Sequence, residues 1–114
     1  MIAVIFEVWP AEGRKDDYLA IAASLRDELS QIEGFISVER FQSVTDEGKM
    51  LSVSFWRDEA ALDEWRRLEQ HRAMQSKGRE SLFEDYRLRV AQVIRDYGME
   101  ARDEAPEDSR ALHG

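Results

Sequence analysis

Trp65 and His71 are the two residues of this sequence whose types and spacing best support chemistry. Both fall in one segment of helical pattern, and His71 is one of only two histidines, the other being His113 near the C-terminal end. An imidazole ordinarily has a pKa of about 6.5, so His71 could accept or donate a proton near neutral pH. The indole of Trp65 could form a flat apolar wall against the rings of a ligand. We therefore take both as candidate catalytic residues.

The segment 66–79 is locally basic in an acidic chain, because its only acidic side chain is Glu69. Within it, Arg72 or Arg79 could stabilise an oxyanion through a charge-assisted hydrogen bond. This local charge would suit an anionic or enolate ligand.

Each candidate also has a packing interpretation. A lone histidine on a partly apolar helix can be a hydrogen-bonded packing residue, and Trp65 follows Leu62 at the spacing of an ordinary core helix. Arg72 can belong to a solvated face, paired with Glu69 on the same helix. Phe83 is compatible with the core or a dimer contact as well as with a binding site.

The composition excludes several classes of function. With 24 acidic and 16 basic residues, the net charge of −8 argues against nucleic acid or an anionic membrane as a partner. There is no cysteine, which excludes disulfides and thiolate sites. One body histidine without a clustered carboxylate pattern gives no metal site. No apolar run is long enough to span a membrane and no signal peptide is recognisable, so a cytoplasmic protein is expected.

The length of 114 residues fits one domain. We place it at residues 1–99. Residues 100–114 are rich in acidic residues and lack apolar periodicity, which predicts a disordered tail.

The apolar pattern predicts the element order βαββαβ. Strands are expected at 2–9, 35–43, 49–56 and 86–96, from β-branched and aromatic alternation. One helix should run from Tyr18 to Gly34, which ends it, and a second should start at the cap Asp58. A short helical turn is expected at 79–86. With right-handed crossovers this order gives a ferredoxin-like α+β fold, a four-stranded antiparallel sheet with both helices on one face.

The other face of that sheet would be left bare. We group Val4, Phe6 and Val8 on one side with Leu51, Val53 and Phe55, and the second side then carries Ile5, Trp9, Ser52, Ser54, Trp56 and Val93. An uncovered face with these tryptophans would expose more apolar surface than monomers usually tolerate. A homodimer that pairs two sheets through this face is therefore expected.

Several local motifs resemble the antibiotic biosynthesis monooxygenase domain family, whose members are dimeric α+β barrels. They are the strand end Trp9-Pro10, Tyr18 in a helix that opens after Gly13, the segment 32–35, the strand end 54–56, and His71-Arg72 followed by Gln75, Gly78 and Arg79. The resemblance covers about residues 1–99.

The resemblance implies a small apolar or aromatic ligand between the sheet and the helices, in a family that includes cofactor-independent oxygenases and haem-degrading enzymes. By position, Trp65 and His71 resemble its pocket residues. The chain contains no asparagine, which family sites often use, so His71, Gln75, Arg72 or a strand serine would have to replace it. The expected substrate-binding residues are Arg72, Gln75, Arg79 and Phe83.

Three functions remain open from the sequence. The first is a cofactor-free monooxygenase of a small aromatic or quinone-like compound, in which His71 removes a proton and the electron-rich product reduces dioxygen. The second is a non-catalytic module that binds a small molecule or haem. The third is a dimeric domain whose pocket has collapsed.

Overall fold

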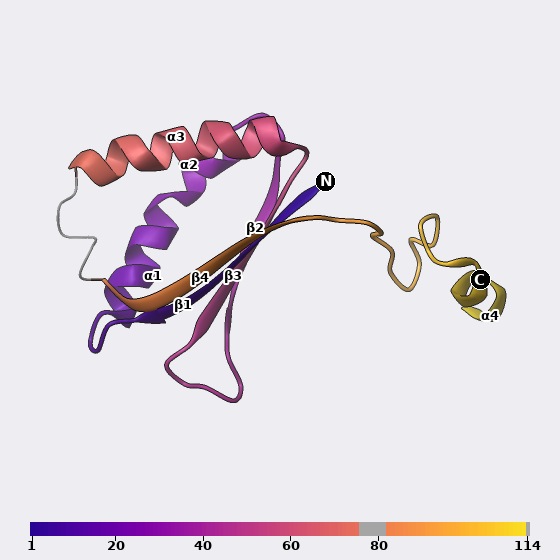
Figure 1. The fold of residues 1–114 in the computed structure, drawn as a ribbon, viewed down its shortest axis with the longest axis horizontal. Coiled ribbons are helices and arrows are strands. Elements are labelled where there is room, and N and C mark those ends of the chain that lie inside the picture. The colour runs from indigo at the N-terminus through magenta and orange to yellow at the C-terminus, as the bar shows by residue number, and fades with distance from the viewer. Residues whose placement is uncertain (76–81, 114) are drawn as a thin grey trace.

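A four-stranded antiparallel sheet with helices on one face forms the body of the molecule (Figure 1). The computed structural model describes residues 1–75 and 82–113, with side chains for 1–69 and 82–110. Its elements are β1 (Ile2–Pro10), α1 (Lys15–Ser24), α2 (Arg26–Ser30), β2 (Phe35–Gln42), β3 (Met50–Trp56), α3 (Glu59–Gln75), β4 (Phe83–Gln92) and α4 (Glu107–His113). The strand order β2-β3-β1-β4 confirms the predicted ferredoxin-like arrangement.

The start of β4 differs from the sequence prediction. Phe83 to Tyr86 are strand and not part of a helical turn, because β4 pairs with the far end of β1 as far as Pro10. The backbone N–H of Ala11 extends this pairing by donating to the carbonyl of Leu82 at 2.8 Å. The strand also ends at Gln92 and not at residue 96, and the last pair of its ladder with β1 joins Gln92 to Ile2. The fourth strand is thus shifted towards the N-terminus.

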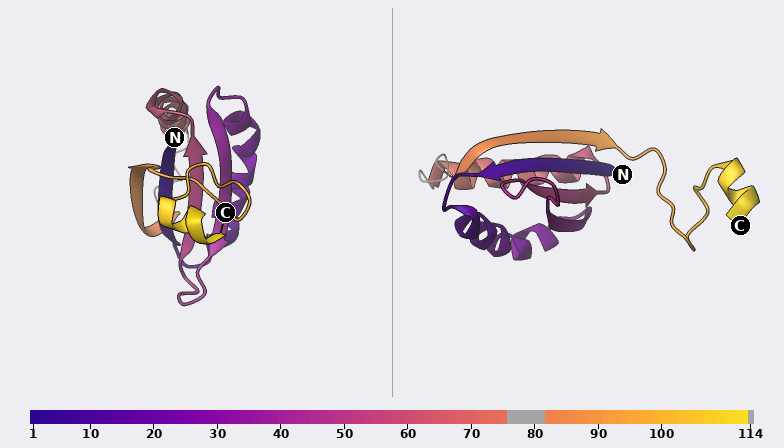
Figure 2. Two further views of the ribbon diagram at one scale, coloured as in Figure 1. Left: turned by 90° about the vertical axis from the view of Figure 1, so that its right-hand side faces the viewer. Right: turned by 90° about the horizontal axis from the view of Figure 1, so that it is seen from below.

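The predicted first helix is divided at Leu25 into α1 and α2. The Ser24 hydroxyl donates to the carbonyl of Ile21 at 2.6 Å, a local bond of the kind that competes with regular helix formation. Both short helices still cover the same face of the sheet as α3 (Figure 2).

The ladder between β1 and β3 settles which residues share a face. It pairs Val4 with Ser54 and Ile5 with Val53, and directly opposed residues of an antiparallel pair project to the same side. The grouping of Val4 with Leu51, Val53 and Phe55 was therefore wrong. The helix side carries Ile2, Val4, Phe6, Val8, Met50, Ser52, Ser54, Trp56, Tyr86, Leu88 and Val90. The opposite side, called the bare face below, carries Ala3, Ile5, Glu7, Trp9, Leu51, Val53 and Phe55.

Two hydrophobic clusters join the helices to the sheet. One gathers Ile2, Val4, Leu29, Ile32, Trp56, Ala61 and Leu62, at the end of the sheet where α3 begins. The other gathers Val8, Tyr18, Met50 and Leu82, at the end where α1 begins. The core is thus divided along the length of the strands.

The first turn of α3 is fixed by a side-chain cap and by close packing. The Asp58 carboxylate accepts a hydrogen bond from the N–H of Ala61 at 3.0 Å, which confirms the predicted cap. This bond, followed by one from Arg57, holds the pKa of Asp58 below its ordinary value. The cap therefore stabilises α3 above the ordinary carboxyl pKa, and its contribution is lost as the pH falls through the lowered pKa.

α4 lies apart from the sheet and the other helices (Figures 1 and 2). The disorder expected for residues 100–114 stays a prediction. Among the described helices, none has the length and apolar composition needed to cross a membrane.

Gly34 provides a test of this packing. Its φ of +92° favours glycine, and a Cβ placed there would lie 2.8 Å from the Cβ of Ala61. Gly34→Ala should therefore lower the free energy of unfolding by about 2–4 kcal/mol, combining backbone strain with overpacking. Gly13→Ala is the matched control, because φ there is +76° but nothing lies within 4 Å. Gly13→Ala should lower the free energy of unfolding by only about 1 kcal/mol. Urea denaturation measures the stability of both variants. Equal decreases in the free energy of unfolding for Gly34→Ala and Gly13→Ala would contradict the close contact between Gly34 and α3.

Candidate functional site

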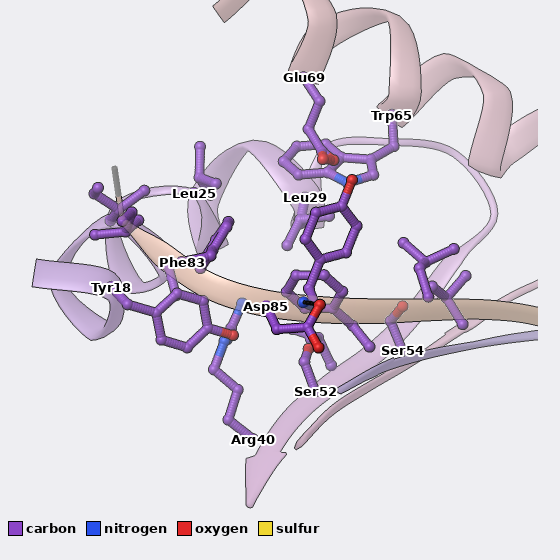
Figure 3. Close-up of a pocket in the computed structure, with 18 of the residues that line it drawn as sticks. Tyr18, Leu25, Leu29, Arg40, Ser52, Ser54, Trp65, Glu69, Phe83 and Asp85 are labelled. Carbon is purple, nitrogen blue, oxygen red and sulfur yellow. Dashed lines mark hydrogen bonds between the residues drawn. The ribbon is translucent and has the colours of Figure 1, made fainter. Parts of the chain in front are cut away.

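A cavity of about 820 Å³ lies between the sheet and the helices, in the region that separates the two clusters (Figure 3). The size is within the range of about 300–1,000 Å³ that small-molecule sites usually have. Side chains from β1, β2, β3, β4, α1, α2 and α3 contribute to its lining. The collapsed pocket considered from the sequence is therefore not supported.

The floor of the cavity consists of two cross-strand rows. The strand registers place Ser54 between Val4 and Val38, and Ser52 between Phe6 and Arg40. Along β3 the helix side carries large residues only at its two ends, Met50 and Trp56, which both belong to clusters. Because the two serines between them have small side chains, space stays open above the middle of the floor.

Aromatic side chains form one end and the roof. Tyr18 and Phe83 meet edge to face with ring centroids 5.7 Å apart, and Phe6 meets Phe83 in the same way at 5.9 Å. Trp65 projects from α3 over the opposite part of the cavity, as Figure 3 shows. Half-buried against the first cluster, Trp65 serves the core and the cavity at once.

The polar groups of the lining occupy two levels. Ser52 and Arg40 lie on the floor, and the Nε atom of Arg40 is buried without a hydrogen-bond partner among the described residues. Glu69, Glu84 and Asp85 are exposed residues of α3 and β4, where they form one side of the mouth. The site therefore combines an apolar interior with one half-buried cation and an acidic rim.

Ser54 has a structural partner within the site. Its hydroxyl oxygen accepts a hydrogen bond from the indole Nε1 of Trp56 at 2.9 Å. The hydroxyl proton is then left to donate towards the cavity. In the described part of the chain, no group of three His, Asp or Glu side chains is arranged to hold a metal ion.

The structure brings together two of the residues predicted from the sequence. Trp65 and Phe83 both line the cavity. His71, Arg72 and Gln75 belong to α3, but their side chains lie outside those described, and Arg79 lies outside the described residues altogether. The roles of all six stay predictions.

Other lining residues were missed as site residues. Tyr18, which the sequence analysis placed only on the first helix, packs in the second cluster and also lines the cavity. Ser52 and Ser54 are strand serines that line the cavity, and the replacement of an asparagine by one of them stays a prediction. Arg40 gave no signal, because its position in FISVERFQ has the alternating polarity of any exposed edge strand. The signal was available only from the register with Ser52 on β3.

The model of the family "Antibiotic biosynthesis monooxygenase" matches residues 1–77. The chain is 52% identical over 93 residues to "Jasmonate monooxygenase ABM" of Pyricularia oryzae, an alignment that covers 82% of this chain. This chain spans less than half of that relative, 43% of its length.

Solved structures show the same fold at low identity. A mutant of SnoaB, a cofactor-independent oxygenase from Streptomyces nogalater, aligns with a TM-score of 0.66 at 10% identity, covering 83% of this chain and 94% of that one. A mutant of MhuD with two manganese protoporphyrin IX molecules bound per active site aligns with a TM-score of 0.70 at 16% identity, covering 86% of this chain and 99% of that one. At these identities the likeness extends to the fold alone.

Ser52→Leu tests whether the cavity is real space. A leucine side chain in the middle of the floor should fill it, raise the free energy of unfolding by about 0.5–2 kcal/mol and abolish ligand binding. Ala23→Leu, at an exposed position of α1 that does not line the cavity, is the control and should change neither stability nor ligand binding. Chemical denaturation measures the stability of both variants. A loss of stability in Ser52→Leu comparable to overpacking a closed core would contradict the cavity.

Proposed function

Because this chain belongs to the antibiotic biosynthesis monooxygenase family, we propose that it is a monooxygenase of a small apolar compound of aromatic or quinone-like type that uses no metal or flavin. The observation that carries the proposal is the cavity of about 820 Å³ beside Trp65. Its apolar and aromatic lining favours a ring system, and its serine, tyrosine and arginine groups can orient that ring system.

Such a reaction can balance without a cofactor when the substrate supplies all the electrons. A methylene flanked by aromatic rings and conjugated to a carbonyl, as in an anthrone, first loses a proton to a base and becomes an enolate. The enolate reduces dioxygen and combines with it as a peroxide. Loss of water then leaves one oxygen atom on the carbon as a new carbonyl, so CH₂ and O₂ become C=O and H₂O.

The protein would contribute a base, an apolar site and a donor for the oxyanion. The sequence assigns the base to His71, on the same helix as Trp65. The hydroxyls of Ser52 and Tyr18 are available on the described walls to stabilise the enolate oxygen. Trp65 and Phe83 would hold the rings.

Oxygen uptake tests the proposal directly. The purified chain is incubated with a panel of anthrones and hydroquinols, together with jasmonic acid because the Pyricularia oryzae relative is named for that substrate class. His71→Ala should slow uptake by about a hundredfold or more, as expected for loss of a general base. His113→Ala is the matched control and should leave the rate unchanged.

A chelator should not change the rate either. No protein-dependent uptake with any compound, or a rate that His71→Ala leaves intact, would reject the proposal. A Soret shift on titration with haem, without substrate oxidation, would instead support a binding role.

The bare face supports the proposed homodimer. Ile5, Leu51, Val53 and Phe55 form an apolar strip on it, and all four are only half-buried in the single chain. Beside the strip, the Glu7 carboxylate lies 3.1 Å from Lys49 Nζ and 2.9 Å from Arg89. The hydrogen bond from Lys49 leads the interactions that lower the pKa of Glu7. A second copy of the sheet would cover the apolar strip and meet this charged border.

Sedimentation tests the dimer with one substitution on each face. The chain should sediment as a dimer of 13.3 kDa subunits at micromolar concentration. Val53→Lys should yield monomers, because it buries a charge in the interface. Leu68→Lys, on exposed α3, is the control and should stay dimeric. A wild-type monomer, or a Val53→Lys dimer, would contradict pairing through this face.

A further inference from the structure

Arg40 is the one cationic side chain that lines the cavity among the described residues. It lies on β2, opposite Ser52 of β3, and its side chain extends from the strand into the cavity in Figure 3. Its Nε atom is buried and has no hydrogen-bond partner, and no ion pair joins the guanidinium to a carboxylate in the described part of the chain. Arginines elsewhere in the fold, such as Arg57 and Arg89, meet Asp or Glu at 2.9 to 3.4 Å.

An arginine in this state is unusual on energetic grounds. A guanidinium stays protonated in proteins, so it cannot relieve its burial by losing its charge. Arg40 as a whole is half-buried, but buried polar atoms such as its Nε nearly always have partners. The missing partner is therefore expected to be an anion that enters the cavity.

The surroundings indicate what kind of anion. Around Arg40 the lining is mostly hydrocarbon, contributed by Val4, Phe6, Ile21, Leu29, Val38 and Trp65. A phosphate or a polyanion would find only one cation there, whereas a planar carboxylate matches the two parallel donors of one guanidinium. Ser52, Arg40's partner in the register, could donate a further hydrogen bond.

The acidic residues at the mouth limit the negative charge that a ligand of the cavity can carry. Glu69, Glu84 and Asp85 are exposed, so solvent screens them, while the Arg40 Nε is buried. They would disfavour a ligand with several negative charges and would leave a single carboxylate at the floor little affected. The alternative is that Arg40 turns to pair with Asp85 or Glu84.

We infer that the cavity takes an apolar, ring-containing monocarboxylate whose carboxylate is held by the guanidinium of Arg40. This inference rests on the proposed function, since it names the chemical class of the substrate for the same cavity. Arg40 would then set the orientation of the ring system below Trp65, with the carboxylate at the floor and the reacting carbon nearer to α3.

Equilibrium binding of matched acids and esters tests the inference. The probes are naphthoic acid with its methyl ester and jasmonic acid with its methyl ester, each followed by quenching of tryptophan fluorescence in the intact chain. At least one acid should bind about ten- to a hundredfold more tightly than its ester, as expected for a buried charge-assisted pair. Arg40→Met should remove this preference, because it should lower the affinity for the acid and leave the affinity for the ester unchanged.

Two further variants separate charge from geometry. Arg40→Lys keeps the charge without the fork of donors, so acid affinity should fall between the wild type and Arg40→Met. Arg87→Met is the control, because Arg87 projects from β4 on the same side as Glu7, away from the cavity. It should leave both affinities unchanged.

Thermal unfolding separates a ligand anchor from a structural residue. Arg40→Met removes a buried Nε that has no partner and breaks no ion pair of the described residues, so the ligand-free variant should be at least as stable as the wild type, with an unchanged or higher melting temperature. The inference is overturned if acids and esters bind with equal affinity, or if Arg40→Met weakens the binding of both equally. It is also overturned if Arg40→Met and Asp85→Asn both lower the melting temperature by similar amounts. The last result would assign Arg40 to an ion pair with the rim.

These outcomes are independent of oxygen uptake. Acid binding that depends on Arg40 in a protein without oxygenase activity would reject the proposed function and keep the ligand class. Oxygen uptake from neutral substrates that is unchanged in Arg40→Met would keep the proposed function and reject the ligand class.

Discussion

Two apolar clusters hold the helices on the sheet at its two ends, and the space between them stays open because the middle of β3 carries serines. Close packing normally eliminates such a space, since every unfilled volume loses dispersion contacts. On the helix side of β3, Met50 and Trp56 have large side chains, whereas Ser52 and Ser54 between them have small ones. The cavity is thus encoded in four alternate positions of a single strand.

The attachment of α3 follows from the same arrangement. Its first turn is fixed at Gly34 by the absence of a side chain and at Asp58 by a cap, so Ala61 and Leu62 can enter the first cluster. One turn later the helix no longer meets the sheet directly. Trp65 spans the distance, which is why it packs against the cluster and forms the roof of the cavity. Its packing and ligand-binding interpretations are therefore compatible.

The sequence predicted the elements well where local pattern decides them. Alternating apolar residues placed β1 and β3 correctly, whereas the first helical region ends at Ser30 and not at Gly34, which lies directly before β2. What it could not supply was the register between strands, because side-chain period alone does not say which residues of two strands stand opposite each other. This is why Trp56 was assigned to the bare face although it is almost fully buried under α3. Register also decided β4, whose acidic start at Glu84 and Asp85 is strand because β1 is there to pair with it.

The candidate site was predicted in part for the same reason. Trp65 stands out by residue type and was predicted from the sequence. Arg40 becomes a site residue only through its neighbours in the sheet, because Ser52 of β3 lies next to it and Phe6 of β1 lies on the other side of Ser52. The alternation of an edge strand gives the same polar pattern whether its polar side faces solvent or a polar-floored cavity. Three-dimensional placement was needed to distinguish the two.

The most direct test of the central claim, that the gap between the clusters is a ligand site, is a titration of isotope-labelled methyl groups with naphthoic acid, followed by NMR. We expect the largest shift changes at Val4, Val38, Leu25 and Leu29, which line the cavity. The methyl groups of Ile5 and Val53 on the bare face should change little. The largest changes at Ile5 and Val53, with Val4 and Val38 unaffected, would contradict the account.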